Sequence, residues 1–169
     1  MTQRAVILVE GVSDRIALET LAVRRGRDLA AEGVAVVAIG GAQAVERAVR
    51  GLGDVRIAGL YDVAEERAVL RGLERAGVAA DGFFACDPDL EGELVRALGP
   101  ERMLELVEAR GQLGAFTTYR KQPAQREKRL EAQLHGWLHN WKIRYAAPLV
   151  EALELERVPR PLEQALAYV

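Results

Sequence analysis

The sequence predicts an α/β fold in which a parallel sheet of about four strands is flanked by helices and followed by a helical C-terminal extension. Two observations predict it. Within residues 1–99, short apolar runs rich in β-branched side chains alternate with segments of helical periodicity. Such alternation implies crossover connections and a mainly parallel sheet. After Gly99 and Pro100 the strand pattern stops, and only helical segments follow.

The four expected strands are continuous apolar runs, which are typical of strands buried on both faces. They cover residues 5–9, 34–39, 55–61 and 82–86. A helix is expected after each strand. The first begins at Ser13 or Asp14, because either side chain can cap its amino end. The four helices are expected over residues 13–23, 42–50, 65–76 and 90–98.

Residues 100–169 are expected to form helices that pack on the core formed by residues 1–99. This stretch is too short for a second core, so we expect a single domain overall. A loop containing Gly111, Gly114 and Pro123 is expected between the first two of these helices. The helices are predicted over residues 101–110, 125–137, 145–154 and 162–167.

Length and composition exclude several classes of protein. A chain of 169 residues suits one domain, and a hydrophobic content of 50% excludes a disordered chain. Cys86 is the only cysteine, so an internal disulfide is impossible. The apolar run that Glu10 ends is too short for a signal sequence or a membrane-spanning helix. A cytoplasmic location without membrane contact is therefore the default expectation.

The net charge of −2 hides an uneven distribution. Residues 1–109 carry 13 basic and 19 acidic side chains, whereas residues 110–147 carry 8 basic and 2 acidic ones. This basic segment either binds the phosphate backbone of a nucleic acid or forms a solvated helix face. Under the first interpretation, the residues expected to contact nucleic acid are Arg120, Lys121, Arg126, Lys128 and Arg129.

Acidic residues follow three of the four expected strands. Glu10 follows the first strand, Asp62 the third, and Asp89 the fourth. Because the carboxyl ends of parallel strands share one edge of a sheet, these side chains are expected to converge there. Converging carboxylates repel one another unless a cation compensates, and hard divalent cations prefer oxygen ligands. Taken singly, such residues also serve as helix caps; as a set, they favour a metal site.

Several segments together resemble the Toprim family. In Val9–Asp14, a Glu ends the first strand, a Gly follows and an Asp starts the helix, as in the opening Toprim motif. Leu60–Asp62 resembles the second motif, an Asp-x-Asp after the third strand. Asp89–Leu94 resembles the Asp-Leu-Glu segment of Toprim domains in OLD-family (overcoming lysogenization defect) nucleases. Residues 120–126 and 142–146 resemble the tail of small, stand-alone actinobacterial Toprim proteins of that group.

The resemblance implies a Toprim (Rossmann-like) fold and one or two Mg²⁺ or Mn²⁺ ions. It extends the set of metal ligands to Glu10, Asp14, Asp62, Glu66, Asp89 and Glu91. The chain departs from the family pattern at one position. Ala64 stands where the second Asp of Asp-x-Asp is expected, and Glu65 or Glu66 is then the candidate for the missing oxygen.

The function that this resemblance implies is metal-dependent nicking or cleavage of DNA, with Glu10, Asp62 and Lys142 as catalytic residues. Lys142 is one of only three lysines beside 20 arginines. A compact ammonium can stabilise charge on a reacting phosphate, although an ordinary surface lysine is the alternative. A second function also remains open, in which the domain binds nucleic acid or a protein partner without catalysis.

OLD nucleases usually carry an ATPase domain upstream. This chain has no Gly-x-x-x-x-Gly-Lys-[Ser/Thr] loop, so any ATPase partner is expected to be a separate polypeptide.

Two further groups of residues allow more than one interpretation. Trp137 and Trp141 lie among basic residues, where aromatic rings can stack on the bases of single-stranded DNA, but packing in a helical core is favoured. His135 and His139 have the i, i+4 spacing of zinc ligands. No third ligand lies near them in the sequence, so a zinc site is not favoured.

Overall fold

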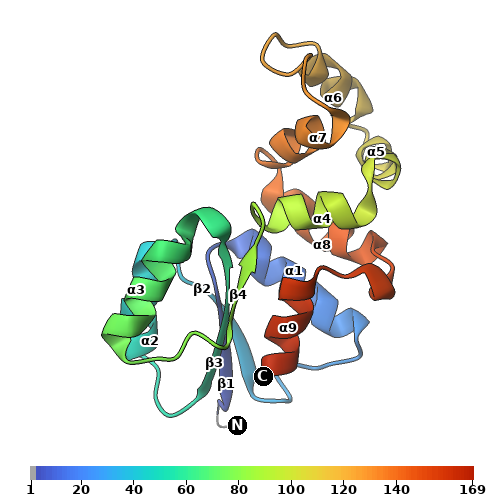
Figure 1. Cartoon of the computed structure of the whole chain (residues 1–169). Helices are drawn as coiled ribbons and strands as arrows, with labels where there is room; N and C mark the ends of the chain where they lie inside the picture. The colour runs from blue at the N-terminus through green and yellow to red at the C-terminus, as the bar shows by residue number, and fades with distance from the viewer. Residues whose placement is uncertain (1–2) are drawn as a thin grey trace.

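The computed structural model describes residues 3–169, and its centre is a sheet of four parallel strands (Figure 1). The strands are β1 (Ala5–Val9), β2 (Val34–Ala38), β3 (Arg56–Asp62) and β4 (Phe83–Cys86), in the order β2-β1-β3-β4. Every residue of the central strand β1 is buried, which explains its uninterrupted apolar sequence. The predicted strands are confirmed to within one residue at each end.

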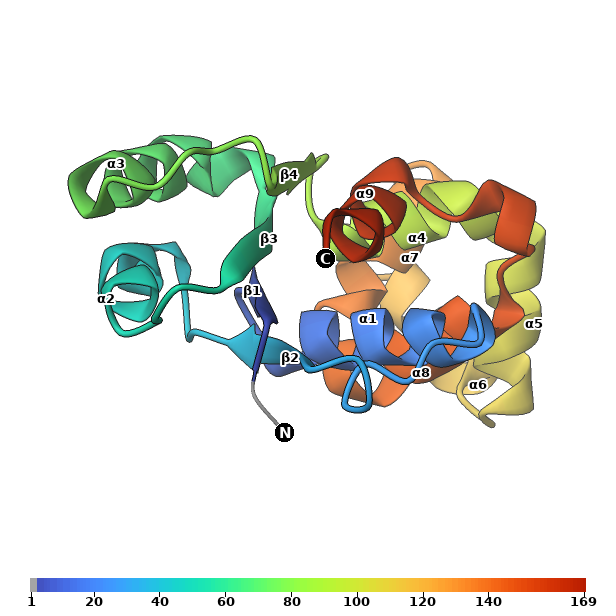
Figure 2. The ribbon, with the colours of Figure 1, turned by 90° about the horizontal axis from the view of Figure 1, so that it is seen from below.

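Helices cover both faces of the sheet (Figure 2). One face carries α2 (Val45–Arg50) and α3 (Glu66–Ala76), and the other carries α1 (Val12–Arg24) and α9 (Arg160–Tyr168). Each face has its own cluster of buried apolar side chains. Short 3-10 turns lie at Ala42–Ala44, Val63–Glu65 and Leu155–Arg157.

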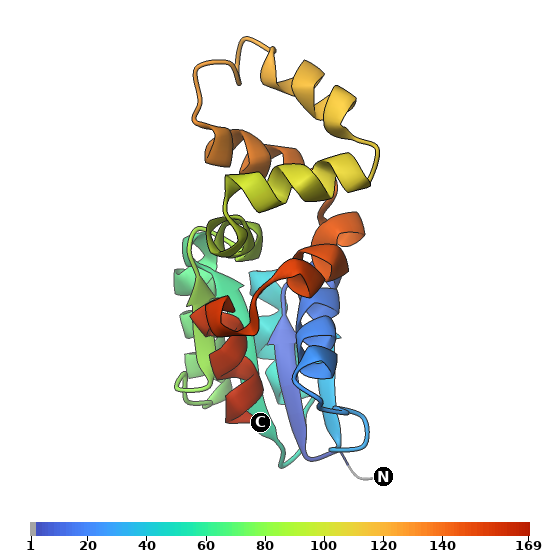
Figure 3. The same cartoon turned by 90° about the vertical axis from the view of Figure 1, so that its right-hand side faces the viewer.

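The remaining helices stand beyond the carboxyl ends of the strands (Figure 3). They are α4 (Leu90–Leu98), α5 (Pro100–Ala109), α6 (Leu113–Arg120), α7 (Leu130–Leu138) and α8 (Lys142–Ala152). Helix α8 packs along α1, and α9 returns to the sheet beside β3 and β4. None of the described helices is both long and apolar enough to cross a membrane.

The structure differs from the prediction in the helical part. Residues 113–120 form α6, where a loop was expected, because Gly111 alone makes the turn with a φ of 68° and Gly114 is accommodated inside the helix. Helix α7 begins later than expected, and α8 begins earlier, at Lys142. The lysine therefore lies in the first turn of a helix.

Candidate functional site

The site lies where the strands end and the helices α4, α7 and α8 approach the sheet. Glu10 directly follows β1, and Asp62 is the last residue of β3. Both side chains are partly buried. Oxygen Oε2 of Glu10 is inaccessible to solvent and has no hydrogen-bond partner within residues 3–169. A buried carboxylate oxygen without a partner is costly unless a cation or a proton compensates it.

Burial and neighbouring carboxylates raise the pKa values of Asp62 and Glu10. Burial and the negative charges of Glu10 and Asp89 raise the pKa of Asp62 to about 7. Burial and the charge of Glu65 also raise the pKa of Glu10, and the positive charge of Lys142 partly offsets this rise. Groups from β1, β3 and α4 are therefore close enough to repel one another, which is the electrostatic condition that a bound cation relieves.

Asp14 joins this group from the first turn of α1. Its Oδ2 accepts a hydrogen bond of 2.8 Å from the backbone N–H of Gly11, so part of its role is to cap the helix. Burial nevertheless raises the pKa of Asp14 to about 6, and the charge of Glu91 adds to the rise. The cap and the site thus use the same carboxylate.

Helix α4 brings two buried acidic residues to the site. Asp89 is the N-cap residue of α4, and its Oδ1 accepts a hydrogen bond of 2.8 Å from the backbone N–H of Gly92. Glu91 is only 4% exposed and pairs with Lys142, whose Nζ lies 2.9 Å from Oε2 of Glu91. Burial disfavours the charged form of Lys142, but the pairing with Glu91 outweighs burial and raises the lysine's pKa. Lys142 therefore stays charged at neutral pH.

Glu65 and Glu66, which follow β3, interact with different parts of the protein. Glu65 acts electrostatically on Glu10, whereas Glu66 accepts a hydrogen bond of 3.3 Å from the hydroxyl of Tyr61. Tyr61 belongs to the core on the α2–α3 face of the sheet. Of the two candidates for the oxygen missing at Ala64, Glu65 is thus the one whose charge reaches Glu10.

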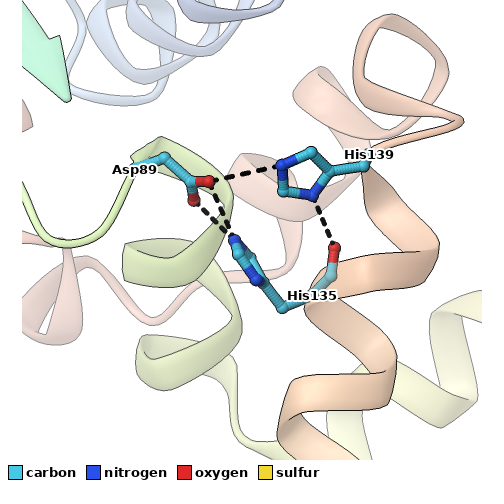
Figure 4. A group of neighbouring side chains, drawn as sticks. All are labelled: Asp89, His135 and His139. Carbon is cyan, nitrogen blue, oxygen red and sulfur yellow. Dashed lines mark hydrogen bonds and ion pairs between the residues drawn. The ribbon is translucent and has the colours of Figure 1, made fainter. Parts of the chain in front are cut away.

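Two histidines, which the sequence analysis did not favour as metal ligands, also belong to the site. Nε2 of His135 lies 2.8 and 2.9 Å from the two carboxylate oxygens of Asp89, and Nε2 of His139 lies 3.6 Å from one of them (Figure 4). No third ligand lies near this pair in the sequence, but the fold brings Asp89 beside it. The only signal available in the sequence was the i, i+4 spacing itself.

The predicted nucleic-acid contacts lie apart from the acidic group. Lys121, Arg126, Lys128 and Arg129 are exposed and belong to the loop between α6 and α7, at the tip of the helical part (Figure 3). Arg120, at the end of α6, donates a hydrogen bond of 2.7 Å to Gln133. These positions are compatible with a phosphate-binding role, which stays a prediction.

The aromatic residues and the cysteine are mainly structural. Trp137 is buried and packs edge-on against Phe116 and Tyr119, as the core interpretation predicts. Trp141 is partly buried, and the Arg144 guanidinium lies over its ring. Cys86 is buried at the end of β4, and burial raises its pKa, so its thiol is unreactive.

Comparisons with known proteins agree with this architecture. Residues 2–60 match the family model described as the TOPRIM domain of overcoming lysogenization defect protein-like proteins. No match was found among curated proteins. The C-terminal region of the Burkholderia pseudomallei OLD protein superposes with a TM-score of 0.73 at 20% identity, covering 99% of this chain and 97% of that one.

A second solved structure gives the same result. The C-terminal region of the Xanthomonas campestris pv. campestris OLD protein superposes with a TM-score of 0.72 at 24% identity, covering 99% of this chain and 92% of that one. The match extends through the helices after residue 99, which the family model does not reach. The chain therefore has a Toprim fold, and it resembles the Toprim domain of OLD proteins.

Proposed function

We propose that this protein cleaves or nicks DNA in a reaction that depends on divalent metal ions. The observation that carries the proposal is the group of acidic side chains at the carboxyl edge of the sheet. They come from β1, α1, β3 and α4. Burial and neighbouring carboxylates raise the pKa values of Glu10, Asp14 and Asp62, and one buried oxygen of Glu10 has no partner in the described part of the chain. The family resemblance supports metal-dependent chemistry on nucleic acid.

The donor set fits Mg²⁺ or Mn²⁺. The expected ligands are carboxylate oxygens, which these hard cations prefer, and partial exposure of Glu10 and Asp62 leaves room for water and a phosphate oxygen. We assign the principal ligands to Glu10 and Asp62, with Asp14, Asp89 and Glu91 completing the set. When bound, the ion would activate a water molecule and neutralise charge on the scissile phosphate.

Lys142 has a separate role in this proposal. Glu91 holds its ammonium group, and the lysine's charge also acts on Glu10 and Asp62, so it lies within electrostatic reach of the phosphate that the acidic group would receive. A fixed positive charge in a partly buried site stabilises the negative charge that develops on the phosphate in the transition state.

The surface beside Lys142 offers a place for the DNA strand. A hollow of about 610 Å³ is lined by Val12 and Ser13 of α1 and by residues 139–144, which form the turn after α7 and the start of α8. Trp141 and Arg144 lie in this hollow. An aromatic ring and a guanidinium there suit stacking on a base and contact with a phosphate.

The test is nicking of supercoiled plasmid in Mg²⁺ or Mn²⁺, with EDTA as the metal-free control. We expect wild-type protein to nick the plasmid only with metal, and Asp62→Asn to reduce the rate at least 100-fold. Asp54→Asn, an exposed aspartate in the loop before β3, is the matched control and should cleave like the wild type.

Two outcomes would contradict the proposal. Nicking that persists in Asp62→Asn or in EDTA would mean that the activity comes from elsewhere in the protein or from a contaminating nuclease. DNA binding without nicking in either metal would instead assign the domain to the non-catalytic class. The alanine at position 64, where the family motif has an aspartate, is the sequence feature that fits this alternative.

A further inference from the structure

We propose that Asp89, His135 and His139 bind a transition-metal ion, at a site that shares Asp89 with the carboxylate group. Each residue offers one ligand atom, and the three atoms lie within 4.8 Å of one another (Figure 4). Such a site is distinct in chemistry from the oxygen-only site proposed above, and it exists whether or not the protein cleaves DNA.

Distant parts of the chain supply the three ligands. Asp89 caps the amino end of α4, His135 lies in the last turn of α7, and His139 is the residue that follows this helix. The i, i+4 spacing places both rings on one side of α7, facing the cap of α4, with ring centroids 4.8 Å apart. Because α4 packs against α7, this arrangement is part of the fold.

Hydrogen bonds already orient two of the three ligands. The backbone N–H of Gly92 fixes Oδ1 of Asp89. Nδ1 of His139 lies 3.1 Å from the backbone carbonyl oxygen of His135, and a carbonyl can only accept, so Nδ1 carries the proton. In the neutral imidazole, which is the form that binds metal, Nε2 of His139 is then the ligand atom, and it lies on the side of Asp89. A backbone carbonyl that fixes the tautomer in this way is the usual support of a metal-binding histidine.

The site is also accessible. The Asp89 side chain is mostly buried, whereas that of His139 is 47% exposed, so an ion can enter from the His139 side. In the metal-free protein, the Nε2–H of His135 donates a hydrogen bond to the Asp89 carboxylate, and a bound ion would take the place of that proton. Three protein ligands leave coordination positions free for water or a phosphate oxygen.

The ligand set determines which metals are favoured. Imidazole nitrogens suit Zn²⁺, Co²⁺ and Ni²⁺, whereas Mg²⁺ prefers oxygen ligands only. We therefore expect Zn²⁺ and Co²⁺ to bind more tightly than Mn²⁺, and Mg²⁺ to bind weakly or not at all at this position.

The test is titration of tag-free protein with Zn²⁺, monitored both by calorimetry and by ¹H–¹⁵N NMR of the histidine side chains. His135 and His139 are the only histidines of the chain, so every imidazole signal comes from this cluster. We expect stoichiometric shifts of both Nε2 resonances. His139→Ala should weaken Zn²⁺ binding at least 100-fold, whereas Asn140→Ala, the exposed neighbour of His139, should leave it unchanged.

The outcomes separate this inference from the proposed nuclease function. Zn²⁺ affinity within about threefold of wild type in Glu10→Gln, together with its loss in His139→Ala, supports a distinct site even if no nicking is found. Histidine resonances that do not respond to Zn²⁺, or an affinity unchanged by His139→Ala, would overturn it, and Asp89 and His135 would then be only an ion pair.

Discussion

At the scale of single residues, the site concentrates negative charge that folding alone does not compensate. Asp62 and Asp14 have pKa values raised to about 7 and about 6, against ordinary values of 3.8. In both cases burial is the largest cause, and neighbouring carboxylates add to it. These buried carboxylates therefore lower the stability of the metal-free protein. Such a cost to stability is common where residues are placed for binding or catalysis.

The first prediction concerns Asp62 and pH. Because the pKa of Asp62 is raised on folding, the folded state binds more protons between about pH 4 and pH 7, and stability falls as the pH rises through this range. Asp62→Asn removes this penalty. In EDTA, the free energy of unfolding of the variant relative to that of the wild type should rise by about 1 kcal/mol from pH 4 to pH 8. This value allows for the solvent exposure of the side chain, which weakens the effect.

Denaturant unfolding of both proteins at the two pH values measures this difference. Asp54→Asn is the control and should show no such gain, because Asp54 is exposed. A gain for Asp62→Asn that is equal at pH 4 and pH 8 would show that the charge of Asp62 is not destabilising.

The second prediction separates binding from chemistry at Lys142. Lys142→Ala should reduce cleavage by about 10²–10³-fold while DNA affinity changes less than threefold, because a charge that acts mainly in the transition state affects rate more than affinity. Lys142→Arg keeps the partner of the buried Glu91 and controls for folding. Single-turnover cleavage and fluorescence anisotropy measure the two quantities. Equal losses of rate and affinity would make Lys142 an ordinary phosphate contact.

The residues of the site were predictable from the sequence to different degrees. Glu10 and Asp62 could be found because each ends or follows a buried apolar strand, and parallel topology then brings the strand ends together. The contact of Asp89 with His135 spans 46 residues and depends on how α7 packs against α4. Periodicity in the sequence carries no information about that packing, so the histidines could not be placed.

At the scale of secondary-structure elements, the cap of α4 connects packing to the site. A Cβ added at Gly92 would lie 2.6 Å from Cδ of Pro88 and 3.3 Å from Oδ1 of Asp89. The lack of a side chain at Gly92 therefore lets the segment before α4 fold closely over its first turn, where Asp89 is held.

The third prediction follows from this close approach. Alanine normally stabilises a helix relative to glycine by about 1 kcal/mol, but Gly92→Ala should destabilise the protein by about 1–3 kcal/mol and weaken Zn²⁺ binding. Gly114→Ala in α6 is the matched control: nothing lies within 4 Å of its added Cβ, so it should stabilise. Thermal unfolding of the two variants shows whether each substitution raises or lowers the stability. A stabilising Gly92→Ala would mean that the cap tolerates a side chain.

The elements themselves were predicted well where burial dictates the sequence and poorly where it does not. The strands were confirmed because a strand covered on both faces must be apolar throughout. Helix α6 was missed because Gly111 and Gly114 suggested one continuous loop, whereas only Gly111 has a positive φ. The early start of α8 was missed for a related reason: no capping residue marks it.

At the scale of the whole molecule, the acidic site and the basic loop are separate. The loop between α6 and α7 projects at one end of the molecule (Figure 3). The acidic residues instead lie at the ends of β1 and β3 and at the amino ends of α1 and α4. We propose that residues 1–99 and 100–169 form one domain, because a single cluster of buried side chains includes Ile7, Leu94, Leu134 and Leu162.

The fourth prediction tests the basic loop as a DNA contact. Arg126→Ala should weaken DNA binding regardless of sequence and flatten the slope of log affinity against log salt by about 0.9, the value for one lost phosphate contact. Arg75→Ala, an exposed arginine on α3, is the control and should leave the slope unchanged. Anisotropy at several salt concentrations measures both. An unchanged slope for Arg126→Ala would make the loop a solvated surface.

The most direct test of the central claim is single-turnover cleavage by Glu10→Gln at saturating DNA, with binding measured in the same Mn²⁺ buffer. Glu10 belongs to the acidic group and is remote in sequence from the basic loop, so we predict a rate at least 100-fold below wild type and an affinity within threefold of it. Glu19→Gln, on the exposed side of α1, should match wild type in both. A Glu10→Gln variant that cleaves at the wild-type rate would contradict the claim that these carboxylates hold the catalytic metal.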